Sequence, residues 1–324
     1  LGSCDSGGKG GAPACQRCPE TRLRLTILTP SLTMQKPMQP TDFRCLERTR
    51  VRWAEVDLQK IVFNAHYLTY VDNAMAAYWR HLAVPYEATM AMLGGDVFLK
   101  TTTVTYHAPA RYDDVLDVGL RCVKTGRSSM HFEAGIWRNG ELLTDVQLVY
   151  VYADPTTNAS RPLPETLVTL IQDFEAGREV MTLTLGDWDT IGPAASHVRS
   201  AVFVEEQGIS REDEWDAADA NCQHAVITNR FNQPLATGRL LPSVDGVSTI
   251  GRMAVLRPMR GTAYGRMVLS ALCKASAERG DRRVELHAQR SAEAFYARQG
   301  FTVVGEPYDE VGIPHVTMTL TLQR

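Results

Sequence analysis

The sequence lacks the features that tie a chain to a membrane, a polyanion or an oxidising compartment. None of its apolar runs approaches the roughly 20 residues that a membrane-spanning helix needs. The net charge is only −3 at pH 7 over 324 residues, which argues against a general nucleic-acid binder. The seven cysteines follow no regular spacing, so a disulfide framework is not expected. We therefore expect a cytoplasmic protein without nucleic-acid or membrane partners.

Residues 1–40 also lack apolar periodicity. They begin "LGSCDSGGKGGAPACQRCPE", a stretch rich in Gly, Ser and Pro, which predicts a disordered N-terminal extension. Cys15 and Cys18 form a single CxxC with only Cys4 nearby, too few ligands for a zinc site, so we expect no metal. The chain begins with Leu, and one interpretation is a misassigned start codon, with Met34 or Met38 as the true start.

The remaining residues have the composition of a globular protein, with 44% hydrophobic and 22% charged residues. This length favours two domains. The pattern restarts around "EAGREV", residues 175–180. We therefore place a boundary near 178, between domains at 41–178 and 179–324.

The first domain begins with a strand-like alternation from about residue 43 and continues with a helix over 65–82. The helix carries apolar residues at helical spacing, namely Tyr67, Tyr70, Val71, Ala74, Tyr78 and Leu82. Strand-like segments follow at 97–108, 115–126, 129–140 and 141–154, and Asn139-Gly140 suits a hairpin turn. A closing helix is expected over 161–174. This order predicts an α+β domain with an antiparallel sheet wrapped around one long helix.

The second domain mixes helices and strands in a different order. Helices are expected over 190–207, 261–280 and 291–300, and Gly280 and Gly300 end the last two. Strands are expected at 181–185, 224–230, 234–243, 248–256, 282–289, 301–306 and 315–322. The two halves are therefore not an internal repeat.

One carboxylate in the first domain lies close to a predicted helix start. Asn64 is a good N-cap residue, and Asp57 precedes it by seven residues at the end of a strand. If the loop folds back, a carbonyl group could sit between the carboxylate and the free amides of the helix start. The amides would stabilise an oxyanion, while Asp57 would attack the carbonyl or activate water. The alternative is that Asp57 is an exposed turn residue.

A glycine-containing loop in the second domain joins a strand to a helix. It reads "RGTAYG" over 260–265, with Arg260, Gly261, Ala263 and Gly265 as its basic or small residues. Successive amides at a helix start can bind a pyrophosphate when no side chain crowds them. The alternative is an ordinary strand-to-helix turn.

The opening of the first domain, "RVRWAEVDLQKIVFNAHYLTYVDNA", resembles hotdog-fold acyl-CoA thioesterases of the 4-hydroxybenzoyl-CoA thioesterase or YbgC-like branch. Later strands match in order, so the resemblance covers about residues 43–175. It implies that Asp57 is catalytic, that the Asn64 N–H polarises the thioester carbonyl, and that the protein forms homo-oligomers, as dimers or tetramers. The chain departs from that family at Lys60, where the family usually has Gly.

The second domain, over about 181–322, resembles GNAT N-acetyltransferases and most of all the ElaA-like branch. The resemblance rests on "IGRMAV", "SAEAFYARQGF", "GIPHVTM" and the 260–265 loop. The resemblance implies an α/β GNAT fold in which Met253 and Val255 contact CoA and Tyr296 protonates the departing thiolate. The family's acyl-CoA loop corresponds here to Arg260, Gly261, Thr262, Ala263, Tyr264 and Gly265, with Ala263 replacing a motif glycine.

The general base of the second domain stays open among Glu206, His224, His287, Glu310 and His315. Together the two resemblances imply a bifunctional enzyme that uses coenzyme A thioesters. One half would hydrolyse acyl-CoA, and the other would transfer an acyl group, expected to be acetyl, to a small amine. The alternative is that only one domain is catalytic and the other senses acyl-CoA or mediates oligomerisation. The sequence specifies neither the acyl chain nor the amine.

Overall fold

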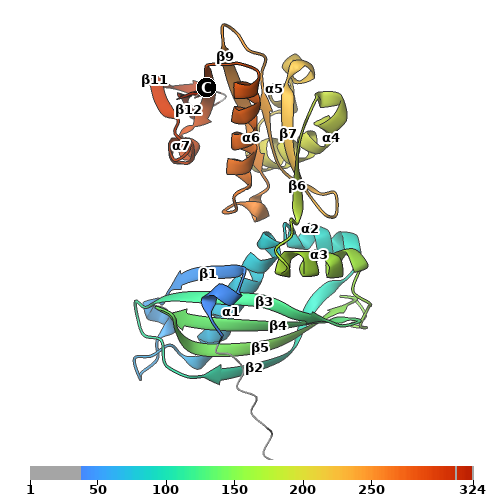
Figure 1. The fold of residues 1–324 in the computed structure, drawn as a ribbon, viewed down its shortest axis with the longest axis vertical. Coiled ribbons are helices and arrows are strands. Elements are labelled where there is room, and N and C mark those ends of the chain that lie inside the picture. Colours follow the sequence, from blue (N-terminus) through green and yellow to red (C-terminus); the bar gives the residue numbers. More distant parts are fainter. Residues whose placement is uncertain (1–37, 311, 323–324) are drawn as a thin grey trace, which may run out of the picture. The chain divides into compact units, whose positions relative to one another are not determined.

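The computed structural model describes residues 38–310 and 312–322. The disorder expected for residues 1–40 therefore concerns a segment that lies, except for its last three residues, outside the described part. Within that part the chain forms two separate sheets, one built from the first half of the sequence and one from the second (Figure 1).

The first sheet has five strands in the order β1-β3-β4-β5-β2, and all neighbouring pairs are antiparallel. Its strands are β1 (Cys45–Arg50), β2 (Asp96–Tyr106), β3 (Val115–Thr125), β4 (Ser129–Arg138) and β5 (Glu141–Ala153). Its helices are α1 (Asn64–His81), α2 (Tyr86–Leu93) and α3 (Glu165–Glu175). The expected sheet, long helix and closing helix are present, whereas the short helix α2 was not anticipated. Among the described residues, β1 and β2 are the unpaired edges, so the sheet is open.

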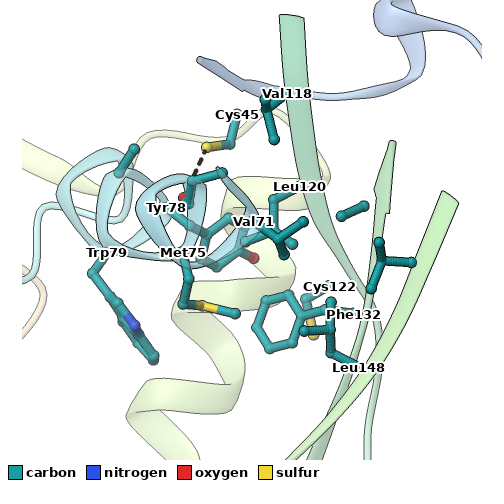
Figure 2. Close-up of a cluster of buried hydrophobic side chains, with 14 of the residues drawn as sticks. Cys45, Val71, Met75, Tyr78, Trp79, Val118, Leu120, Cys122, Phe132 and Leu148 are labelled. Carbon is teal, nitrogen blue, oxygen red and sulfur yellow. Dashed lines mark hydrogen bonds between the residues drawn. The ribbon is translucent and has the colours of Figure 1, made fainter. Parts of the chain in front are cut away.

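The core of the first half lies between α1 and the concave face of this sheet. Figure 2 shows Val71, Met75 and Tyr78 of α1 directed toward apolar side chains of the strands. The strand residues in that view include Val118, Leu120, Phe132 and Leu148. Burying each such side chain stabilises the fold by about 1.5–3 kcal/mol. This packing fixes the direction of α1 and with it the position of its N-terminus.

The second sheet has seven strands in the order β11-β12-β10-β9-β8-β7-β6. Its strands are β6 (Met181–Gly186), β7 (Gln223–Asn229), β8 (Pro234–Leu240), β9 (Val247–Val255), β10 (Arg283–Gln289), β11 (Thr302–Glu310) and β12 (Ile313–Thr321). Its helices are α4 (Trp188–Arg199), α5 (Arg211–Glu214), α6 (Tyr264–Glu278) and α7 (Glu293–Ala297). The helix predicted over 190–207 instead changes character, because Ser200–Glu206 is a π-helical segment, η3.

The helices α4 and α6 cover opposite faces of this sheet. Ala225 and Ile227 of β7 pack in the cluster that contains α6, whereas Val226 packs with α4. Because side chains alternate between the faces of a strand, the two helices lie on different sides.

The two central strands of the second sheet separate partway along their length. β9 and β10 pair in parallel from Val247 with Arg283 to Ile250 with Leu286 and no further. Both strands continue beyond that point. β9 also bulges, because two residues, Arg252 and Met253, lie opposite Gly238 of β8. The separation opens a gap between the ends of the two strands.

Candidate functional sites

The loop between β1 and α1 folds back on itself and brings Asp57 to the start of α1. Val56 and Val62 form an isolated antiparallel bridge, and the Asp57 N–H donates to the Ile61 carbonyl at 2.9 Å. The Asp57 carboxylate is half-buried, and its Oδ1 accepts a hydrogen bond from the Gln59 N–H at 2.8 Å. Its other oxygen, Oδ2, accepts none from a described residue.

A second pair of contacts anchors this loop to the helix. The Phe63 N–H donates to the Glu55 carbonyl at 2.9 Å. The Glu55 side chain is buried and accepts from the Tyr70 hydroxyl on α1 at 2.7 Å and from the Arg52 N–H at 2.8 Å. The strand end that carries Asp57 is thus tied to the first turns of α1.

The helix tip beside Asp57 has free amide donors. Phe63, and not Asn64, is the N-cap, and no side chain caps this helix. Asn64 is therefore the first helical residue, which corrects the prediction that it caps the helix. Within the described residues, the backbone amides of Asn64 and Ala65 donate no hydrogen bond. The Asn64 carbonyl accepts from the Tyr106 hydroxyl at 3.0 Å, which fixes the tip against β2.

The departure at Lys60 has a structural consequence. Lys60 adopts φ +61°, in the left-handed region, and its N–H closes the turn on the Asp57 carbonyl at 2.9 Å. The chain therefore keeps the conformation that suits glycine at the expense of local strain.

A cavity of about 770 Å³, lined mainly by residues of the first half, lies away from this tip. Apolar side chains dominate its lining, among them Met75, Trp79, Phe132 and Tyr150. Its α1 residues begin at Asp72, so it lies roughly 12 Å or more along the helix from Asn64. It is thus not the space beside Asp57.

The 260–265 loop leaves its backbone amides open. Gly261 has φ +82°, and no atom lies within 4 Å of the place where a Cβ would stand. Among the described residues, the amides of Gly261, Thr262 and Ala263 donate no hydrogen bond. The Thr262 hydroxyl donates to the Met259 carbonyl at 2.7 Å, and Ala263 is the N-cap of α6. No packed side chain therefore covers Gly261 at the start of this turn.

Two residues of the loop face elsewhere. Arg260 donates two hydrogen bonds to Glu206, both at 2.7 Å, and its Nε donates to the Val255 carbonyl at 3.1 Å. Tyr264 is buried in the core under α6. The side chain of Arg260 thus braces the loop, and the backbone is what the loop presents. A Cβ at Gly265 would lie 3.5 Å from Phe295 and Val255, an ordinary van der Waals distance, so a small side chain would fit there.

A cavity of about 480 Å³ occupies the gap between β9 and β10. Met253 of β9 and Tyr296 of α7 both line it, together with residues of η3, α5, β11 and β12. Tyr296 is buried, and burial raises its pKa to about 12, so its hydroxyl stays protonated at neutral pH.

The five candidate bases have different surroundings. Arg260 holds the pKa of Glu206 below its usual range by hydrogen bonding, and Glu206 does not line the cavity. Burial lowers the pKa of His224, whose Nε2 lies 2.9 Å from the Asp219 carbonyl, outside the cavity. The other three, His287, Glu310 and His315, line the cavity.

One wall of the cavity rests on an ion-pair network that sequence reasoning did not reveal. Arg199 is buried between Trp188 and Trp215 and pairs with Glu214 and Asp219. The network continues through Arg239 to Asp216 and Asp219, and through Arg252 to Glu214 and Asp216. The acidic run 212–219 is therefore partly buried and paired. No local pattern signals this, because the arginines come from α4, β8 and β9.

Comparison with known proteins matches the two halves to two families. The model of the "Thioesterase superfamily" matches residues 59–144, and that of the "Acetyltransferase (GNAT) domain" matches residues 215–322. The chain is 33% identical over 129 residues to Protein ElaA of Escherichia coli, covering 39% of this chain and 84% of ElaA.

The second half of the chain belongs to the GNAT family, and residues 59–144 of its first half match the thioesterase superfamily model. An N-acetyltransferase of Bacillus subtilis, YjcF, described as uncharacterized, is 34% identical over 125 residues, which are 38% of this chain and 88% of YjcF. A thioesterase of Thermus thermophilus, solved in complex with coenzyme A and Zn, is 28% identical, with a TM-score of 0.38. That match covers 43% of this chain and 98% of the thioesterase chain.

The predicted fold class is confirmed: a hotdog-type thioesterase domain precedes a GNAT domain, and the sheets are not closed barrels. Within residues 38–310 and 312–322, no cluster of three or more His, Cys, Asp or Glu is placed to hold a metal ion. No helix in this range is both long and apolar enough to cross a membrane.

Proposed function

We propose that this chain is a bifunctional enzyme acting on coenzyme A thioesters, with an acyl-CoA thioesterase at 41–178 and an N-acetyltransferase at 179–324. The observation that carries the proposal is that each half has a helix start with free backbone amides. In the first half the loop that carries Asp57 leads into this helix start, and in the second the helix packs at Gly265 against Phe295, the neighbour of Tyr296.

In the hydrolytic site, the amides of Asn64 and Ala65 would receive the thioester carbonyl oxygen. Charge develops on that oxygen in the transition state, so donors already in place lower the barrier. Because Gln59 holds Oδ1 of Asp57, Oδ2 is the oxygen free to attack the carbonyl carbon or to take a proton from water. The carbon–sulfur bond then breaks, and the CoA thiolate leaves. If Asp57 attacked directly, water would then hydrolyse the acyl anhydride on its carboxylate.

An exposed apolar surface beside this site supports a homo-oligomer. Leu58 is fully exposed and Trp53 is 75% exposed, while Phe63 and Tyr112 are about half exposed. Trp53 and Tyr112 touch edge to face, with ring centroids 5.4 Å apart. Neighbouring exposed apolar side chains are typical of a surface that a partner covers, and we propose that a second copy of this chain covers this one.

In the transferase site, the amides of Gly261, Thr262 and Ala263 would hold the diphosphate of acetyl-CoA at the start of α6. The pantetheine arm would follow β9 past Val255 and Met253 into the gap between β9 and β10. The thioester would then lie beside Tyr296, whose protonated hydroxyl would supply a proton to the departing thiolate.

The test is the release of free thiol from a panel of acyl-CoA thioesters, with and without primary amines. Asp57→Asn should lower amine-independent release at least about 10²-fold and spare the amine-dependent part. Tyr296→Phe should do the reverse. Asp113→Asn, an exposed acid paired with Arg50 in the same half, is the matched control and should change neither.

A half that shows no turnover would contradict its assignment as an enzyme. If such a half is nevertheless stabilised against heat by CoA, it is the acyl-CoA-sensing module of the alternative interpretation.

A further inference from the structure

The cavity between β9 and β10 contains a histidine that is held unlike the others. His315 lies on β12 opposite Gln289 of β10, near the point where the chain leaves β10 toward Tyr296. The side chain lines the cavity and is only 9% exposed. Among the described residues its side chain has one hydrogen-bond partner, and this contact defines how the imidazole is held.

One hydrogen bond defines the tautomer of His315. Its Nδ1 lies 2.7 Å from the carbonyl oxygen of Ile313. A carbonyl oxygen can only accept, so Nδ1 carries the proton. In the neutral ring the lone pair is then on Nε2.

The Nε2 atom of His315 is free and accessible. It makes no hydrogen bond or ion pair with another described residue. Nε2 also keeps some solvent-accessible surface. It differs in this from the fully enclosed polar atoms that lack a partner among the described residues, which are Thr102 Oγ1, Thr144 Oγ1, Asp219 Oδ2 and Arg239 Nε. Because His315 borders the cavity, this lone pair is open to a molecule bound there.

A stacking contact holds the ring in place. The Tyr308 ring stacks on the His315 ring, with centroids 6.1 Å apart and an interplanar angle of 23°. The Tyr308 hydroxyl is hydrogen-bonded to Nδ1 of His287. His287 is exposed, and its hydroxyl partner can donate or accept, so this bond does not define the tautomer of His287.

We propose that His315 Nε2 is the general base that activates the amine acceptor, an inference that rests on the proposed transferase function. The acceptor is a protonated primary amine. It suits a cavity whose rim includes Glu310, a carboxylate that pairs with no described cation.

The proton balance of this step is complete. His315 Nε2 takes one of the three ammonium protons, and the nitrogen lone pair attacks the thioester carbon. When the carbon–sulfur bond breaks, Tyr296 protonates the sulfur and recovers a proton from the same nitrogen. The third proton stays on the product amide. The Ile313 carbonyl continues to accept from Nδ1 and stabilises the imidazolium that forms.

Two amines of similar size test this role in full-length protein carrying Asp57→Asn, which removes background hydrolysis. Benzylamine is protonated at neutral pH, whereas aniline is not and needs no base before it attacks. His315→Gln should lower kcat/KM for benzylamine at least about 10²-fold and for aniline by less than about tenfold. His197→Gln, an exposed histidine of α4 outside this cavity, is the matched control and should match the parent.

Equal losses for both amines, or no loss for either, would overturn the inference while leaving acetyl transfer intact. A selective benzylamine loss in His287→Gln in place of His315→Gln would also overturn it. If the parent protein transfers acetyl to neither amine, the proposed function fails first and the inference falls with it.

A second measurement does not depend on activity. In ¹⁵N-histidine NMR spectra of the wild-type chain, the His315 signal is identified by its disappearance in His315→Gln. We expect a protonated Nδ1 and an unprotonated Nε2 at pH values where the ring is neutral. A ring protonated at Nε2 would contradict the inference, because that nitrogen would have no lone pair to accept a proton.

Discussion

Replacing Lys60 by glycine should stabilise the thioesterase domain. The residue sits at φ +61° in the turn that carries Asp57, and its exposed side chain has no hydrogen bond or ion pair with a described residue. The Lys60→Gly substitution therefore removes backbone strain without removing a hydrogen bond or ion pair to a described residue. Its N–H continues to close the turn on the Asp57 carbonyl.

The expected gain is the balance of two terms. A residue with a Cβ loses about 1–2 kcal/mol in the left-handed conformation. Glycine offsets about 0.5–1 kcal/mol of this gain, because the unfolded chain with glycine is more flexible. We therefore expect Lys60→Gly to raise the free energy of unfolding by about 0.5–1 kcal/mol. Hydrogen exchange followed by mass spectrometry, read on peptides from β3 to β5, assigns this change to the first half of the chain.

Asn139→Gly is the matched control. Asn139 is also exposed and has φ +51° in the hairpin between β4 and β5, but asparagine tolerates this conformation better than lysine. Its gain should therefore be smaller than that of Lys60→Gly. If Lys60→Gly leaves exchange unchanged or speeds it, the assignment of strain to this turn is wrong.

Two further predictions concern the GNAT domain. Gly261→Ala should weaken CoA binding about tenfold, since the left-handed φ of the loop costs alanine about 1–2 kcal/mol. The control is Gly140→Ala, at φ +84° with equally open surroundings, which should lose similar stability without changing CoA affinity. Calorimetric titration of both variants with CoA measures the difference. Hydrogen bonds from Arg239 lower the pKa of Asp216 from 3.8 to about 2. The stabilisation of the fold by this ionised carboxylate is thus present above about pH 4 and is lost as the pH falls toward 2. Hydrogen exchange of α5 should therefore accelerate in that window. Asp216→Asn should abolish the acceleration, and an unchanged pH dependence in that variant would contradict the role of this carboxylate.

Local patterns predicted most of the scaffold. The helical spacing from Tyr67 to Leu82 marks the face of α1 that the sheet buries, and Asn139-Gly140 marks the hairpin between β4 and β5. α2 was not predicted, because a segment of eight residues is too short to show a clear period. The π-helical conformation of Ser200–Glu206 was not predicted, because its apolar spacing is close to that of an α-helix.

The sites were predictable only in part. Asp57 and the 260–265 loop stand out because a helix start follows each in sequence, and a helix start is a local signal. The pairing of Arg260 with Glu206 and the orientation of His315 depend on residues brought together by the tertiary fold. Asn64 was misread as a cap because asparagine favours that position, whereas the bond from Phe63 N–H to Glu55 sets the helix start one residue earlier.

Both halves are proposed to bind a CoA thioester at a helix start. Calorimetric titration of the full chain with a non-hydrolysable acyl-CoA thioether tests it most directly. We predict about two binding events per chain, of which Gly261→Ala weakens one and leaves the other unchanged. A single event that Gly261→Ala does not alter, or no binding at all, would contradict the account.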